Sequence, residues 1–337
     1  MPTVYKVLRP DDLDDQASQR ETFALDVLMG LSSSPKQLSS KYFYDETGSR
    51  LFNRITRLKE YYLTGCEHEI LAARGGDLAA VFEGAPFNLV ELGPGEGQKT
   101  QTLLQSFLSR SLRFRYLPID ISRSALESLA ESLGREFPKL AIEGLVADYF
   151  TGLKWLSRQK EKNRTCVLFL GSNIGNFNHA EARAFLRSLW NALNDGDLVL
   201  IGFDLKKDID IMLEAYNDAQ GVTREFNLNL LHRINRELGG DFDVDRYRFF
   251  ATYDVFGGSI NSYLVSLAEQ TVYVEAVGQR FRFRPWEPIR TEYSYKYLES
   301  DIKSLAAETG FRVEMQLYDA KRYFADSLWR VVKASRA

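Results

Sequence analysis

The sequence predicts an α/β protein in which helices cover both faces of a parallel sheet, with a second, smaller α+β domain attached. Two observations predict this fold. Through residues 87–204, short apolar runs alternate with amphipathic segments, a pattern typical of parallel sheets that are buried on both faces. After Asp204 the pattern changes to a long helical stretch followed by several strand-like segments.

The elements of the first part follow one another along the chain. Strands are predicted at 87–92, 113–122, 139–149, 166–171 and 197–204, and helices at 99–110, 123–137 and 179–193. Ser122 stands where the N-cap of the second of these helices is expected. In parallel sheets, ligands bind where the carboxyl ends of the strands open into loops, so we expect the functional site there.

The second part is predicted to be an insertion into the first. A long helical region is expected at 208–238, and strand-like segments follow at 248–256, 259–269, 271–277 and 279–285. Residues 300–334 return to a helix and two strands. We therefore expect a larger domain of residues 63–206 and 297–337, and a smaller domain of residues 1–62 and 207–296.

The composition excludes several classes of protein. A hydrophobic fraction of 45% with 26% charged residues is typical of a globular chain, and a net charge of -3 provides no general attraction for nucleic acid or anionic membranes. The sequence has no apolar run of membrane-spanning length, and its start lacks the apolar stretch of a signal peptide, so we expect a cytoplasmic protein. We also expect a monomer that acts on a small-molecule substrate. Its two cysteines and three histidines have no metal-binding spacing, so no metal site is expected.

A glycine-dense turn, GPGEGQKT, follows the first predicted strand and opens a helix, an arrangement that presents backbone N–H groups to a ligand. The dinucleotide pattern GxGxxG fails in both frames. The phosphate-loop pattern GxxxxGK[ST] fails only at Gln98, but the later strand ends in Gly171 and Ser172 and lacks the acid that would bind magnesium. A phosphate-loop nucleotide hydrolase is therefore one alternative. The other is the E-x-G-x-G turn of S-adenosylmethionine-dependent methyltransferases, with Glu91 as its acid.

Acidic residues at the next two strand ends favour the methyltransferase interpretation. Asp120 ends the second strand, where an acid binds ribose hydroxyls. Asp148 and Tyr149 end the third strand and are placed to meet an adenine amino group and ring. Lys99 would pair with the carboxylate of the cofactor, or would be a solvated residue in the first turn of the helix. The glycines alone are also compatible with a tight strand-to-helix turn that binds nothing.

A second set of motifs is more specific than the turn. Together these motifs resemble the histidine Nα-methyltransferase family of ergothioneine biosynthesis, which is related to the dimethylallyltryptophan N-methyltransferases. The resemblance runs in order from about residue 20 to 335. The motifs are KYFYDETGSRLFNRITRLKEYYLTGCEHEIL, LVELGPGEGQKT, FLGSNIGNF, AYNDAQGVTREFN, INRELGGDFD and RTEYSYKY.

This resemblance implies a Rossmann-like methyltransferase domain, S-adenosylmethionine as cofactor, and a substrate-binding domain for a free amino acid. It implies methylation of the α-amino group of histidine to the trimethylated betaine hercynine, with tryptophan or a tryptophan derivative as the alternative substrate. The implied cofactor-binding residues are Gly93, Lys99, Asp120, Asp148 and Tyr149. The implied substrate-binding residues are Tyr44, Phe52, Tyr61, Asn176, Tyr216, Ser262, Glu292 and Ser294, of which Asn176 and Tyr44 are the catalytic candidates.

Several of these residues have a structural alternative. Tyr44 and Tyr61 are also compatible with amphipathic packing, Tyr216 with a core position, and Asn176 with the cap of the next helix. Glu292 and Ser294 are two apart in a strand and would share a face, where a carboxylate and a hydroxyl suit the two ring nitrogens of an imidazole; the alternative is a solvated charged face.

Ser262 departs from the family pattern. At this position we expect the histidine enzymes to have a larger apolar residue against the imidazole. A small polar residue here enlarges the expected pocket.

Overall fold

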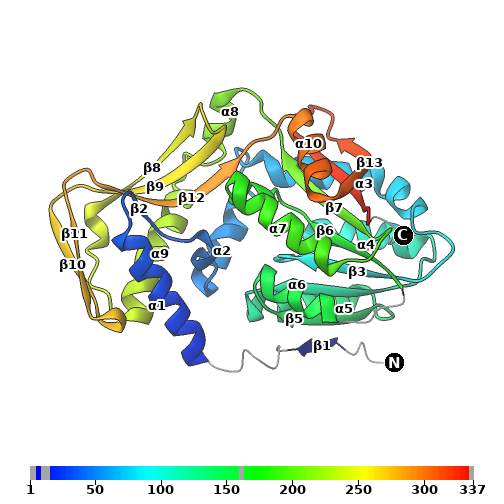
Figure 1. Cartoon of the computed structure of the whole chain (residues 1–337), viewed down its shortest axis with the longest axis horizontal. Helices are drawn as coiled ribbons and strands as arrows, with labels where there is room; N and C mark the ends of the chain where they lie inside the picture. The colour runs from blue at the N-terminus through cyan, green and yellow to red at the C-terminus, as the bar shows by residue number, and fades with distance from the viewer. Residues whose placement is uncertain (1–4, 9–15, 159–162, 334–337) are drawn as a thin grey trace. The chain divides into compact units, whose positions relative to one another are not determined.

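The computed structural model describes residues 5–8, 16–158 and 163–333 (Figure 1). The chain divides into two compact units, each built from segments that are distant in sequence. The first unit contains the described residues of Met1–Pro10, Leu63–Lys206 and Tyr295–Ala337. The second contains those of Asp11–Tyr62 and Lys207–Ser294.

The first unit is built around a sheet that has eight strands within the described residues, in the order β1-β5-β4-β3-β6-β7-β14-β13. The strands are β1 (Tyr5–Leu8), β3 (Phe87–Leu92), β4 (Phe114–Asp120), β5 (Ala141–Val146), β6 (Arg164–Phe169), β7 (Leu198–Asp204), β13 (Phe311–Tyr318) and β14 (Phe324–Val331). The pairs from β1 to β7 are parallel, whereas β14 is antiparallel to both β7 and β13. All six residues of the central strand β3 are buried, as expected for a strand covered on both faces.

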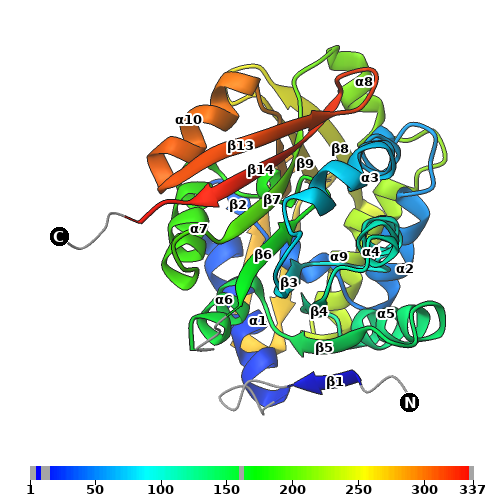
Figure 2. The same cartoon turned by 90° about the vertical axis from the view of Figure 1, so that its right-hand side faces the viewer.

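Helices lie on both sides of this sheet. They are α3 (Tyr62–Ala80), α4 (Gln98–Ser109), α5 (Arg123–Glu136), α6 (Tyr149–Arg158), α7 (His179–Ala192) and α10 (Glu299–Thr309). Figure 2 shows α6, α7 and α10 on one side and α3, α4 and α5 on the other. The predicted α/β class is confirmed, and the hydroxyl of Ser122 caps α5 as predicted, accepting a hydrogen bond from Ala125 N at 3.3 Å.

The second unit combines helices with a small sheet. Its elements are α1 (Gln16–Ser32), β2 (Lys36–Gln37), the 3-10 turn η1 (Ser40–Phe43), α2 (Glu46–Ile55), α8 (Ile209–Glu214), α9 (Val222–Leu238), η3 (Val244–Arg246), β8 (Tyr247–Asp254), β9 (Ser259–Ser266), β10 (Gln270–Val274), η4 (Glu275–Val277), β11 (Gln279–Phe283) and β12 (Pro288–Tyr295). One sheet has the order β2-β12-β9-β8, and β10 and β11 form a separate two-stranded ribbon. Side chains of α1, α2, α9 and both sheets share one apolar core.

The long helix expected at 208–238 is in fact two helices. Between α8 and α9 the chain turns, because the Asp218 carboxylate accepts hydrogen bonds from Val222 N and Thr223 N, both at 2.8 Å. Gly221, at φ +73°, adopts the left-handed conformation that starts α9. An acid and a glycine at this spacing form a helix start, which the apolar periodicity alone does not reveal.

The structure also differs from the expected domain boundaries. Residues 1–62 were assigned to the smaller domain by the sequence pattern, yet β1 pairs in parallel with β5, with Tyr5 opposite Ile142. Residues 295 and 296 likewise belong to the first unit. A four-residue strand gives too short a pattern to assign to one sheet or another. Within the described ranges, no helix combines the length and apolar character needed to cross a membrane.

Candidate active site

The glycine turn joins β3 to α4 with three residues in the left-handed region. Gly93, Gly95 and Gly97 have φ angles of +70°, +56° and +69°. A Cβ atom at Gly93 would lie 2.7 Å from the hydroxyl oxygen of Tyr149, and one at Gly97 would lie 2.1 Å from a methyl carbon of Leu129. The turn therefore requires glycine for its backbone conformation and for its close neighbours.

Asp120 connects the ends of β4 and β3. Its Oδ1 accepts a hydrogen bond from Ser122 N at 2.8 Å, and its Oδ2 accepts one from Gly95 N at 3.3 Å. Burial raises the pKa of this carboxyl above its ordinary value, although the backbone donors oppose the shift. A carboxylate has about four acceptor positions, so Asp120 can accept further hydrogen bonds from a ligand.

Asp148 and Tyr149 lie at the start of α6. The Asp148 carboxylate accepts hydrogen bonds from Thr151 N at 3.0 Å and from Thr151 Oγ1 at 2.9 Å, so it caps the helix and remains exposed. The Tyr149 ring packs edge-on against Phe169, with centroids 5.2 Å apart, and burial raises the pKa of its hydroxyl. Tyr149 thus lies against the glycine turn. Asp148 caps α6, a structural role in addition to its predicted contact with adenine.

Lys99 forms an ion pair that the sequence patterns do not predict. Its ammonium donates to the carboxylate of Glu67, a fully buried residue of α3. The two oxygens of Glu67 also accept from Gly171 N, at 2.7 and 3.0 Å. Glu67 therefore links the helix that follows the glycine turn to the loop after β6. Its spacing from Leu63 and Ile70, on the apolar face of α3, was the available signal, since an acid at such a position must be paired.

Two more buried acids lie in the same part of the sheet. Asp326 of β14 lies opposite Gly202, where an added Cβ would come within 2.3 Å of a Glu67 oxygen. Burial, together with the charge of Glu67, raises the pKa of Asp326 well above its ordinary value. The Glu91 carboxylate accepts from Thr100 Oγ1 at 2.5 Å and from the Tyr116 hydroxyl, and burial raises its pKa to about 7.

Asn176 ends a 3-10 turn, η2 (Asn173–Asn176), in the loop after β6. The capping alternative for this residue is wrong, because Asn178 caps α7 and accepts hydrogen bonds from Ala180 N and Glu181 N, both at 2.9 Å. The Asn176 side chain is half-buried and has no hydrogen bond to the other described residues. The loop itself is fixed where Ser172 Oγ accepts a hydrogen bond from Asp204 N at 3.1 Å.

The second unit brings four of the predicted aromatic residues into one cluster. Ring centroids lie 5.5 Å apart for Tyr44 and Phe52, 6.3 Å for Phe52 and Tyr61, and 6.1 Å for Tyr61 and Tyr216. All three pairs meet edge to face, a favourable geometry for aromatic rings. Phe226 of α9, which the motifs did not single out, also packs against Tyr44 and Phe52, at 5.7 and 5.8 Å.

Tyr216 connects this aromatic cluster to β12. Its hydroxyl lies 2.6 Å from the hydroxyl of Ser294, and both residues are buried. Arg290 lies over the ring of Tyr293, three residues further along β12, at 4.1 Å from its centroid. Burial alternates along β12 as far as Thr291 and then breaks, because Glu292 and Tyr293 are both half-buried before the buried Ser294.

Ser262 lies in β9, the strand next to β12. Its backbone carbonyl accepts a hydrogen bond from Thr291 Oγ1 at 3.1 Å, one residue before Glu292. The Ser262 side chain is 1% exposed, and its hydroxyl has no hydrogen-bond partner among the described residues. A buried hydroxyl without a partner costs free energy, so this position is unusual for a purely structural serine.

Comparison with known proteins assigns the family. The model of the histidine-specific, S-adenosylmethionine-dependent methyltransferases matches residues 23–331. The chain belongs to this family. It is 38% identical to the histidine N-alpha-methyltransferase of Mycolicibacterium smegmatis over 88% of this chain and 90% of that protein. For the histidine N-alpha-methyltransferase of Mycobacterium tuberculosis the identity is also 38%, over 85% of this chain and 87% of the relative. The L-tryptophan methyltransferase of Psilocybe serbica is 27% identical, over 84% and 86% of the two chains.

Membership of this methyltransferase family excludes the phosphate-loop hydrolase alternative. The first unit fits the family's cofactor, S-adenosylmethionine, because a Cβ atom at Gly93 would fill the space beside Tyr149 and because Asp120 retains acceptor capacity at the turn. Lys99 carries a neutralising partner in Glu67, unlike the free cation that a phosphate-loop lysine provides.

Proposed function

We propose that this protein transfers methyl groups from S-adenosylmethionine to the α-amino group of histidine, giving the trimethylated betaine hercynine for ergothioneine biosynthesis. The family match and the two histidine N-alpha-methyltransferases at 38% identity over most of both chains support this substrate. The tryptophan enzyme is more distant, at 27% identity.

The residues around the glycine turn would hold the cofactor. Asp120 would accept hydrogen bonds from ribose hydroxyls, and Tyr149 with Asp148 would contact the adenine. Lys99 would offer its remaining ammonium hydrogens to the cofactor carboxylate. Gly93 would allow the backbone to approach the ligand closely.

The aromatic cluster of the second unit suits a substrate nitrogen that becomes a cation. Each methyl transfer adds bulk to this nitrogen, and the third leaves a permanent positive charge. Tyr44, Phe52 and Tyr61 would surround it through cation–π attraction, worth about 0.5–2 kcal/mol. Tyr216 and Asn176 would hold the amino and carboxylate groups, while Glu292 and Ser294 would bind the imidazole nitrogens.

The chain's own residues would accelerate the reaction by alignment. The cofactor supplies an electrophilic methyl group on a sulfonium, and the attacking amine must be neutral. The α-amino group has a pKa of ~8 or above, so the pocket must accept the deprotonated amine or take its proton on binding. Asn176 and Tyr44 would fix the direction of the nitrogen lone pair. Such positioning can lower a barrier by roughly 7 kcal/mol or more, so neither a nucleophilic side chain nor a metal is required.

Tryptophan, or a tryptophan derivative, is the second candidate substrate. Ser262 favours it, because a small residue replaces the larger apolar one expected against an imidazole and so leaves more room. The choice depends on whether Glu292 and Ser294 bind the side chain of the substrate.

Calorimetric titration with free amino acids, in the presence of the demethylated cofactor S-adenosylhomocysteine, tests the substrate directly. Histidine should bind and tryptophan should bind more weakly. Tighter binding of tryptophan would favour the second candidate, and binding of neither would refute both. Light scattering of the purified protein tests the expected monomer, and the location of a tagged chain in cells tests the expected cytoplasmic site.

A further inference from the structure

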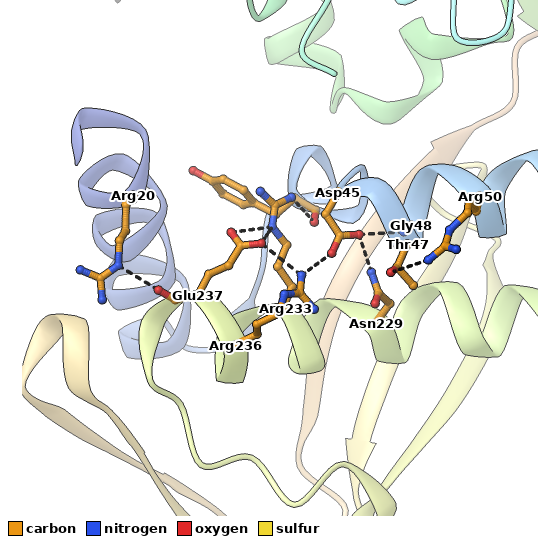
Figure 3. A network of polar contacts seen from close by, with 10 residues as sticks. Arg20, Asp45, Thr47, Gly48, Arg50, Asn229, Arg233, Arg236 and Glu237 are labelled. Carbon is orange, nitrogen blue, oxygen red and sulfur yellow. Dashed lines mark hydrogen bonds and ion pairs between the residues drawn. The ribbon is translucent and has the colours of Figure 1, made fainter. Parts of the chain in front are cut away.

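A polar network holds the segment that carries Tyr44 (Figure 3). Its centre is Asp45, whose side chain is 10% exposed. Asp45 Oδ1 accepts hydrogen bonds from Gly48 N at 2.7 Å, which caps α2, and from Asn229 Nδ2 of α9 at 2.8 Å. Asp45 Oδ2 pairs with the guanidinium of Arg236, also on α9. One carboxylate therefore joins the start of α2 to the middle and the last turn of α9.

A second anchor lies on the other side of Tyr44. Arg233 of α9 donates from Nη1 to the backbone carbonyl of Tyr42 at 2.9 Å and lies over the Tyr42 ring. Arg233 is itself held by Glu237, one turn along α9, at 3.1 Å. The residues two before and one after Tyr44 are thus each tied to the same helix.

The chain between the two anchored residues, Tyr42 and Asp45, has little conformational freedom. At Gly48 an added Cβ would lie 1.6 Å from the Phe43 carbonyl oxygen, so α2 packs directly on the backbone that precedes Tyr44. The Tyr44 ring meets Phe226, which belongs to the helix that supplies Asn229, Arg233 and Arg236. Contacts with α9 therefore hold both the backbone around Tyr44 and the Tyr44 ring in place.

We propose that Asp45 and Arg236 are positioning residues for substrate binding, which act by fixing Tyr44 within the aromatic cluster that receives the amino group. This inference rests on the proposed function, because it assigns the ion pair to amino-acid affinity and not to the cofactor. An ion pair that served only to join α2 to α9 would leave amino-acid affinity unchanged when weakened.

The Asp45→Asn variant tests this directly. It keeps an oxygen for Gly48 N and Asn229 but removes the charge that pairs with Arg236. Arg236→Ala removes the partner, and Arg236→Lys restores a cation as the conservative rescue. The matched control is Glu225→Gln, because Arg54 and Glu225 form a 3.1 Å ion pair between the same two helices without touching Asp45.

The expected result is a KM for the amino acid raised by about tenfold to a hundredfold in Asp45→Asn and Arg236→Ala, as for a misplaced positioning group. The KM for S-adenosylmethionine should stay within about twofold of the wild type, since it binds the first unit. Arg236→Lys should recover most of the loss, and Glu225→Gln should behave as the wild type. An unchanged amino-acid KM in Asp45→Asn would overturn the proposal, as would equal effects on both substrates.

Hydrogen–deuterium exchange separates this inference from the proposed function, because it needs no substrate. Amides of residues 40–50 should exchange faster in Asp45→Asn and Arg236→Ala but not in Glu225→Gln. If the wild type methylates neither histidine nor tryptophan, the proposed function fails on that result alone. Faster exchange confined to Asp45→Asn and Arg236→Ala would then show only that the ion pair holds the segment around Tyr44, whereas identical exchange in all variants would overturn the positioning inference.

Discussion

Replacing Glu91 with glutamine should remove part of the pH dependence of stability. Glu91 is 2% exposed, lies on the central strand β3, and its carboxylate accepts hydrogen bonds from Thr100 and Tyr116. Burial raises its pKa from the ordinary 4.5 to about 7. Because its charged form is disfavoured inside the protein, the folded state keeps the proton over a range in which the unfolded chain has lost it.

The sign and size of the effect follow from proton linkage. Below about pH 4.5 Glu91 is protonated in both the folded and the unfolded chain, so its contribution to the free energy of unfolding has its full value there. As the pH rises from 4.5 to about 7, unfolding releases a proton, so the free energy of unfolding falls by about 1.4 kcal/mol per pH unit. Over the whole interval the loss is about 3 kcal/mol, an order-of-magnitude value.

Urea unfolding of wild type and Glu91→Gln at several pH values between 5 and 8 measures this. The other acids titrate in both proteins, so the difference between the two curves isolates Glu91. As the pH rises, the free energy of unfolding of the variant should fall less steeply than that of the wild type, and the difference between them should change by about 3 kcal/mol in favour of the variant. Glu96→Gln, an exposed acid in the glycine turn, is the control and should follow the wild type. Parallel curves for wild type and Glu91→Gln would refute the reasoning.

Three further predictions concern other parts of the two units. Glu67→Ala should lower the free energy of unfolding by about 3–5 kcal/mol, because it leaves a lysine and a backbone N–H without their buried partner. The control Glu69→Gln, on the exposed side of the same helix, should lower it by about 1 kcal/mol or less. Equal losses for the two variants in urea unfolding would contradict this prediction. Tyr216→Phe and Ser294→Ala should each cost about 1 kcal/mol, and the double variant less than their sum, since they share one hydrogen bond; additive losses in a double-mutant cycle would show otherwise. Gly93→Ala should weaken the binding of S-adenosylmethionine, measured by calorimetry, at least about tenfold. The φ of +70° at this position disfavours a side chain, and the added Cβ would meet the hydroxyl of Tyr149. Unchanged affinity would argue against a cofactor site at this turn.

Much of the fold was predictable because buried parallel strands are continuous apolar runs, and strands such as 87–92 and 197–204 stand out in the sequence for that reason. Ser122 was recognisable as a cap because its side chain acts on the helix that immediately follows. These are local signals. Tyr44 and Tyr216 are predicted as substrate-binding residues by sequence motifs, whereas periodicity alone would assign Tyr216 to a core position.

The interactions that could not be predicted join residues far apart in the chain. Glu67 and Lys99 are 32 residues apart, and nothing in either segment names the other as its partner. Asp45 and Arg236 are separated by 191 residues. The strand β1 has only four residues, so its place beside β5 is decided by the tertiary fold. Long-range pairing of this kind depends on the assembled sheet and helices and leaves no local pattern.

The most direct test of the account is a competition assay. The protein is incubated with S-adenosylmethionine and equal amounts of histidine and tryptophan, and the products are followed by mass spectrometry. We expect histidine to be converted in sequence to its mono-, di- and trimethylated forms, while tryptophan remains largely unchanged. Methylation of tryptophan in preference to histidine, or of neither, would contradict the proposed function.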